Sequence, residues 1–219
     1  MISHDHKCIF LHIPKTGGGS IEKLFTGSHL PCRDVVTELG FTERRHTKPD
    51  QLFTLNPNWS EIWDTYRKFT FVRNPWARLW SYWQYHKDTG RNLIPEFVKT
   101  FKDFIFWMDP NMPPSFPRDT GLPYPDRTKA PPPLMLEWIS VGGVVDTSIE
   151  VLRFEHYASE LSNFLSASKL TKKLLLATIP HTHRTLSEDY KTQYGPVMRE
   201  RVAEIYTKDI EYFGYTFEQ

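Results

Sequence analysis

The sequence predicts a three-layer α/β/α sandwich with a mostly parallel sheet. Two apolar strands, over residues 8–13 and 68–72, each lead into a helix, and a third strand and helix follow over residues 149–166. Strands that alternate with helices favour a parallel sheet. Ligands of such open sheets bind beyond the carboxyl ends of the strands, so we expect the functional residues directly after the first two strands.

The first strand leads into a glycine-rich turn, the segment 14–20 with the sequence Pro-Lys-Thr-Gly-Gly-Gly-Ser, and then into a short helix over Ile21 to Phe25. Glycine lets the backbone approach a ligand closely, and N–H groups at a helix start attract anions. The segment therefore predicts a phosphate or sulfate site, with an ordinary glycine turn as the alternative. It is not a Walker A loop, because its lysine precedes the glycines.

The second strand, over residues 68–72, ends at Arg73, and Pro75 favours the first turn of a helix that continues to about Lys87. Arginine offers a planar fork for phosphate, and Ser81 on the helix adds a hydroxyl donor. The alternatives are an ion pair at the helix start for Arg73 and a solvated or back-bonded helical serine for Ser81.

Apolar spacing and proline content predict the remaining elements. Prolines are dense from Pro110 to Pro133, which indicates a long surface loop. Helices are expected over residues 97–108, 157–166 and 196–213, a strand over Ile149 to Phe154, a short apolar run over 174–179, and a mixture of helix and loop over 35–58.

Composition narrows the class of protein. A chain of 219 residues favours a single domain, residues 1–219, and a net charge of +1 argues against a broad surface for nucleic acid. Two cysteines make no disulfide framework and no metal-ligand spacing. The start of the chain is too polar for a signal peptide, and no apolar run reaches the ~20 residues of a membrane span. We expect a soluble, cytoplasmic protein.

Together, the glycine-rich segment and the Val-Arg-Asn-Pro…Ser motif resemble those of sulfotransferases that use 3′-phosphoadenosine 5′-phosphosulfate (PAPS). The resemblance is closest to the carbohydrate 2-O- and 4-O-sulfotransferases and their bacterial relatives, and it implies a P-loop NTPase-like sulfotransferase fold. In that family the first motif binds the 5′-phosphosulfate and the second binds the 3′-phosphate. The residues so implied are Lys15, Thr16, Gly17, Gly18, Gly19, Ser20, Arg73 and Ser81, with Arg184 as a further candidate.

Sulfuryl transfer needs a general base for the acceptor hydroxyl and stabilisation of charge on the leaving oxygen. Lys15 can provide the second without a metal. His46 is the candidate base, because related enzymes carry a histidine before the second motif and an ordinary imidazole pKa of about 6.5 suits neutral pH. The alternative for His46 is a surface histidine. We expect a core or supporting role for His12, and the competing candidates for the base are His181, His183 and Glu155.

These motifs predict a PAPS-dependent sulfotransferase that acts on a hydroxyl of a carbohydrate or small metabolite. Two alternatives stay open: a nucleotide-dependent phosphotransferase, which requires a magnesium-binding carboxylate near Lys15, and a non-catalytic nucleotide-binding module. We expect the 110–133 loop on the acceptor side, where Arg118, Tyr124, Arg127 and Lys129 are candidate contacts.

Overall fold

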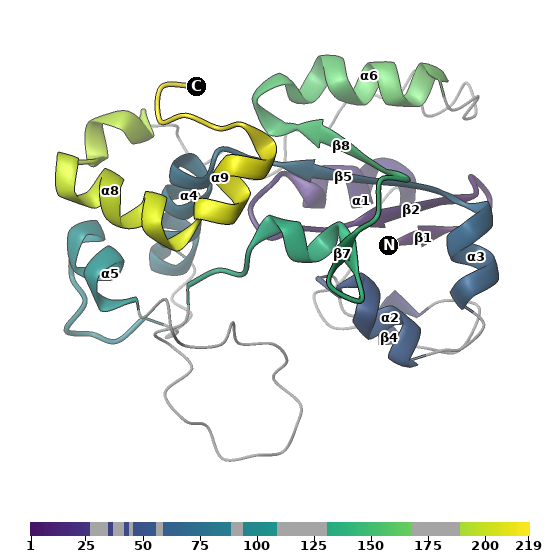
Figure 1. The fold of residues 1–219 in the computed structure, drawn as a ribbon, viewed down its shortest axis with the longest axis horizontal. Helices are drawn as coiled ribbons and strands as arrows, with labels where there is room; N and C mark the ends of the chain where they lie inside the picture. The colour runs from purple at the N-terminus through teal and green to yellow at the C-terminus, as the bar shows by residue number, and fades with distance from the viewer. Residues whose placement is uncertain are drawn as a thin grey trace. The chain divides into compact units, whose positions relative to one another are not determined.

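A four-stranded, mostly parallel sheet lies in the first of two units of the computed structural model (Figure 1). The structure describes residues 1–26, 35–36, 42–43, 46–55, 59–88, 94–108, 131–167 and 189–219. The first unit comprises residues 1–73 and 135–183, and the second comprises 74–134 and 184–219. The prediction of a single domain stays a prediction.

The sheet has the strand order β1-β2-β5-β8, in which β2 (Cys8–Leu11), β5 (Arg67–Val72) and β8 (Ile149–Arg153) run parallel. A short first strand, β1 (Ile2–Ser3), pairs antiparallel with β2 and was not predicted. The mixed α/β class and the mostly parallel sheet are confirmed. The predicted third strand ends one residue early, because Phe154 begins the 3-10 turn η3 (Phe154–His156).

An aromatic core covers one face of the sheet and packs it against α1 (Gly18–Thr26) and α6 (Tyr157–Ala167). The Phe69 ring lies 5.0 Å from Phe10 on the neighbouring strand and 4.1 Å from Phe164 on α6. All four residues of β2 are buried, as expected of a parallel strand covered on both faces. Each large side chain withdrawn from water here contributes about 1.5–3 kcal/mol.

A buried lysine occupies the other side of β5. Lys68 is 5% exposed, and its Nζ donates to the carbonyl of Trp63 at 2.6 Å and to that of Tyr66 at 3.4 Å. These carbonyls close the C-terminal end of α3 (Trp59–Thr65), where positive charge is favoured. The hydrogen bonds offset the cost of burying the ammonium group and connect α3 to the sheet.

Helices and an aromatic core form the described part of the second unit. The predicted helix after Pro75 is α4 (Pro75–Asp88), and its aromatic face is buried. The next helix, α5 (Phe101–Trp107), begins later than the predicted start at residue 97. Thr100 accepts from the Asp103 N–H at 3.1 Å, and Asp103 accepts from the Thr100 N–H at 2.9 Å, a capping box that starts the helix at Phe101.

The single helix predicted over residues 196–213 is wrong, because the chain forms α8 (Pro196–Ile205) and α9 (Thr207–Phe213). The break lies at Tyr206, whose backbone has φ −110° and ψ 24°. Its buried hydroxyl donates to the carbonyl of Pro132 at 3.0 Å. The break therefore coincides with a side chain that is buried and hydrogen-bonded to a residue distant in sequence.

The chain also forms several short strands, turns and helices. The turn Gly142–Gly143, with φ +58° and +78°, joins β6 (Ser140–Val141) to β7 (Val144–Val145), a hairpin that the Gly-Gly pair could have indicated. The other short elements are β3 (Val35–Val36), β4 (Thr42–Glu43), α2 (Pro49–Leu55), η2 (Met135–Trp138) and η4 (Tyr190–Gln193).

Two predicted segments fall on residues that the structure does not describe, namely most of the loop over 110–133 and the apolar run over 174–179. Within the described ranges, no helix combines the length and the apolar character needed to cross a bilayer. The cytoplasmic location stays a prediction.

Burial should make Cys8 chemically inert in the native chain. Withdrawal from water raises the pKa of its thiol to about 12, so the reactive thiolate is scarce at pH 8. We expect iodoacetamide to leave Cys8 unmodified in the folded protein and to alkylate it rapidly in guanidinium chloride, as measured by peptide mass spectrometry. Native-state labelling at the rate of a free thiol would contradict the burial of this strand.

Candidate functional site

The loop between β2 and α1 has an unusual backbone. Lys15 has φ +69° and Gly17 has φ +84°, both in the left-handed region, and Thr16 between them is fully buried. The Thr16 hydroxyl donates to the carbonyl of Ile13 at 2.9 Å, which holds the loop closed. Left-handed geometry costs a lysine about 1–2 kcal/mol, and strain of this kind is characteristic of functional loops.

Helix α1 begins at Gly18, three residues before the predicted start at Ile21. Gly18, Gly19 and Ser20 therefore form the first turn of the helix, where the Ser20 N–H donates to the carbonyl of Gly17 at 3.0 Å. This turn contains no acidic residue. The positive end of the helix dipole favours an anion here, and the phosphate or sulfate site stays a prediction.

Two of the glycines leave no room for a side chain. A Cβ at Gly17 would lie 2.9 Å from ring atoms of both Phe154 and Tyr157, and a Cβ at Gly18 would lie 2.1 Å from Cδ2 of His12. The Tyr157 hydroxyl donates to the carbonyl of Gly17 at 3.1 Å, and burial raises its pKa well above the usual value, so it stays protonated. Close packing by His12, which follows β2, and by side chains from η3 and α6 thus shapes the loop.

Arg73 follows β5 directly and lies beside this loop. Its Nη1 donates to the carbonyl of Lys15 at 3.2 Å, and its guanidinium lies 4.4 Å from the centre of the Phe154 ring. The same Phe154 ring closely approaches Gly17. The carboxyl ends of β2, β5 and β8 therefore meet at one edge of the sheet, and they bring Lys15 and Arg73 together as the sequence predicts.

His46 also lies at this edge. Its Nδ1 is 2.9 Å from the carbonyl oxygen of His12, and the two imidazole rings are 4.4 Å apart with an interplanar angle of 68°. A carbonyl oxygen is an acceptor, so Nδ1 of His46 must carry the hydrogen. In the neutral ring the lone pair is then on Nε2, the arrangement that a general base requires.

His12 has a charged partner that sequence reasoning missed. Its Nδ1 lies 2.6 Å from Oε1 of Glu22 on α1, and the two residues are 5% and 1% exposed. The available signal was a glutamate next to Ile21 on a short apolar helix, where an unpaired carboxylate would be costly. His12 is therefore a buried, hydrogen-bonded histidine at the start of the loop, in agreement with its predicted supporting role.

Ser81 belongs to the second unit and is buried within α4. The helix that carries it is capped by Asn74, whose Oδ1 accepts from the N–H groups of Trp76 at 3.1 Å and Ala77 at 3.4 Å. Sequence reasoning missed this role of Asn74, although asparagine before Pro75 is a usual helix-start signal. The grouping of Ser81 with the residues of the first unit stays a prediction.

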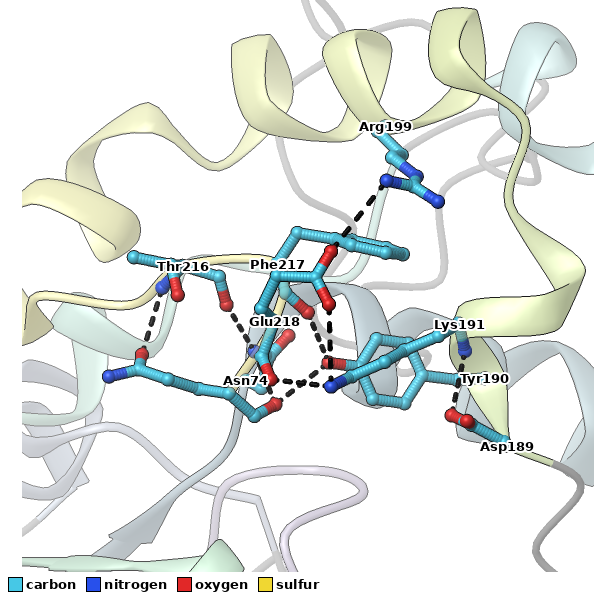
Figure 2. Close-up of polar contacts among 9 residues, drawn as sticks. Asn74, Asp189, Tyr190, Lys191, Arg199, Thr216, Phe217 and Glu218 are labelled. Carbon is cyan, nitrogen blue, oxygen red and sulfur yellow. Dashed lines mark hydrogen bonds and ion pairs between the residues drawn. The ribbon is translucent and has the colours of Figure 1, made fainter.

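Asn74 is itself held by the C-terminal segment of the second unit (Figure 2). Its Nδ2 donates to the carbonyl of Thr216 at 2.8 Å. The hydroxyl of Tyr190 lies 2.6 Å from the carbonyl oxygen of Phe217 and 2.8 Å from that of Gln219. The orientation of the capping amide therefore depends on residues far along the chain.

Of the other candidates, the structure describes Glu155. Glu155 is exposed in η3. Among the residues that the structure describes, no group of three side chains is arranged to hold a metal ion. The candidates that lie outside the described residues are Arg118, Tyr124, Arg127, Lys129, His181, His183 and Arg184.

Comparison with known proteins gives one match. The sequence model of the sulfotransferase family matches residues 1–112, just over half of the chain. The matched segment includes the glycine-rich loop, His46, Arg73 and Ser81. No curated protein and no solved structure matches the chain.

The Gly18→Ala substitution should destabilise the first unit, because the new methyl group would overlap the His12 ring. We expect the free energy of unfolding in urea to fall by about 1–3 kcal/mol, as for other overpacked sites. Gly195→Ala is the control, since a Cβ there meets nothing within 4 Å, and we expect it to cost less than about 1 kcal/mol. Equal stability of the two variants would contradict the close contact at Gly18.

Proposed function

The chain belongs to the sulfotransferase family, and we propose that it transfers a sulfuryl group from PAPS to a hydroxyl of a carbohydrate or small-molecule acceptor. The observation that carries this proposal is the meeting of Lys15 and Arg73 beside the glycine turn that opens α1. We propose with it the three-layer, P-loop-like arrangement that the family resemblance implies.

The chemistry of the donor site fits a phosphosulfate. Gly17 and Gly18 let the loop pack closely against Phe154, Tyr157 and His12, and the first turn of α1 offers a positive dipole end to the 5′ group. We propose that Thr16, Gly19 and Ser20 complete this contact, and that Arg73, Ser81 and Arg184 hold the 3′-phosphate. Arginine suits this role, because its guanidinium binds phosphate through two parallel hydrogen bonds.

Lys15 and His46 have complementary roles in the proposed reaction. PAPS supplies the activated sulfuryl group. Lys15 places a positive charge where negative charge grows on the leaving phosphate oxygen. Nε2 of His46 takes the proton of the acceptor hydroxyl, while the Nδ1 hydrogen stays bonded to the carbonyl of His12. In this scheme Lys15 keeps its proton throughout, and the backbone of the loop does not move.

The product nucleotide 3′-phosphoadenosine 5′-phosphate should stabilise the protein against heat. At a concentration of 100 Kd, binding adds about 2.7 kcal/mol, which corresponds to a rise in Tm of roughly 5–10 °C for a chain of this size. We expect ATP with magnesium to give a much smaller rise in the same thermal-shift assay. Equal shifts for the two nucleotides, or none for either, would contradict the donor assignment.

Removal of either reacting side chain should lower turnover far more than it lowers stability. We expect Lys15→Ala to reduce kcat by about 10²–10³-fold and His46→Ala by about 10²–10⁴-fold. Turnover is measured as release of 3′-phosphoadenosine 5′-phosphate with a panel of sugar and small-molecule alcohols.

Lys208→Ala, at an exposed position on α9, is the matched control and should keep full activity. Full activity of His46→Ala would transfer the role of base to another histidine or to Glu155. Tight nucleotide binding with no turnover by the native protein would instead favour a non-catalytic binding module.

A further inference from the structure

We propose that His12 and Glu22 are positioning residues that hold His46, the proposed base, in place beside the donor loop. The inference rests on the proposed function and deepens it. The pair is buried, and its two polar atoms, Nδ1 of His12 and Oε1 of Glu22, lie 2.6 Å apart. Neither residue was predicted to contact the donor, and neither belongs to the two sequence motifs.

The pair joins the two ends of the loop. His12 precedes the loop at the end of β2, and Glu22 lies on α1 after it, ten residues along the chain. The hydrogen bond therefore limits how far the strand end and the helix can separate. Lys15, with its strained φ of +69°, lies between these two fixed points.

The imidazole of His12 is confined on two further sides. The backbone of Gly18 lies so close that an added Cβ would be 2.1–2.6 Å from three ring atoms of His12. On another side its ring centre is 4.4 Å from that of His46. With Nδ1 directed to Glu22 and Gly18 blocking rotation toward α1, the His12 ring forms a fixed surface against which His46 packs.

His12 contacts His46 through its backbone as well as its ring. The carbonyl of His12 accepts the Nδ1 hydrogen of His46 at 2.9 Å, which selects the tautomer with the lone pair on Nε2. One residue thus sets both the protonation pattern and the ring orientation of the base. A displacement of about 1 Å at a reacting group can cost about 10²-fold in rate, so loosening His12 should reduce kcat.

Stability alone does not explain a buried pair of ionisable residues in this place. Burial of two ionisable groups carries a large desolvation cost, and apolar side chains of similar volume often serve stability equally well. An apolar pair could not direct the His12 ring toward His46, whereas a hydrogen-bonded pair can. The directional hydrogen bond between Glu22 and His12 is therefore the property that positions His46 in this proposal.

The test compares Glu22→Gln with Glu22→Leu. Glutamine keeps an oxygen that accepts from His12, and leucine removes it. For Glu22→Leu we expect kcat to fall 10–100-fold, while Kd for 3′-phosphoadenosine 5′-phosphate changes less than about threefold. Glu22→Gln should keep kcat within about threefold of the native protein. Unchanged kcat in Glu22→Leu, or a parallel loss of kcat and nucleotide affinity, would overturn the positioning role.

A double-mutant cycle tests whether the effect passes through His46. In the His46→Ala background we expect Glu22→Leu to cause no further loss of kcat, because the residue it positions is gone. If instead the two substitutions lower kcat by factors that multiply, then His12 and Glu22 act independently of His46, and the inference would be overturned. Should Glu22→Leu fail to fold, His12→Asn replaces it: its amide can still donate to Glu22, but it lacks the ring that contacts His46. Native kcat in His12→Asn would equally overturn the inference.

Glu150→Leu is the matched control. Glu150 pairs with Arg67 near the start of β5, at the opposite end of the strands from Lys15 and Arg73. We expect this variant to lose stability but to keep native kcat at a temperature where it is folded. Absence of nucleotide binding and turnover in the native protein would overturn the proposed function and this inference together. If the native protein turns over and the kcat of Glu22→Leu equals the native kcat, the inference would be overturned while the proposed function would stand.

Discussion

The parallel pairing of β2, β5 and β8 is the constraint on which the candidate site depends. The register sets Phe10 opposite Phe69 and Phe71 opposite Leu152, so all three strands end at the same edge of the sheet. Lys15 and Arg73 follow neighbouring strands at that edge. They meet through the hydrogen bond from the Arg73 guanidinium to the Lys15 carbonyl, so no contact between their two charged groups is needed. The aromatic core therefore determines the register, and the register determines which polar residues become neighbours.

Close packing then converts this edge into a shaped loop. Gly17 packs against Phe154 and Tyr157, and Gly18 packs against His12, so these three side chains fix the course of the loop backbone. A loop that was merely flexible would have to be ordered on binding, at about 1–2 kcal/mol per residue. Here the contacts of Thr16 and its neighbours hold the left-handed turns before any ligand arrives.

The three parallel strands and the pairing of Lys15 with Arg73 could be predicted from the sequence, because short apolar runs and the residues after them are local signals. The start of α1 could not, since glycine is a poor helix former and contacts with His12 and Tyr157 decide where the helix begins. The break at Tyr206 coincides with a hydrogen bond to a carbonyl far away in sequence. The role of Glu22 was missed for the same reason. Its partner, His12, lies on the other side of the loop, and the apolar spacing of a helix does not predict such a contact.

This loop combines two energetically costly features. Lys15 has left-handed geometry, and the ionisable residues His12 and Glu22 are buried beside it. A folded chain is stable by only about 5–15 kcal/mol, so such costs persist where surrounding packing enforces them. Because the glycine-rich loop, His12 and His46 share one set of contacts, a change that relieves the strain would also displace the groups proposed to act on the substrate.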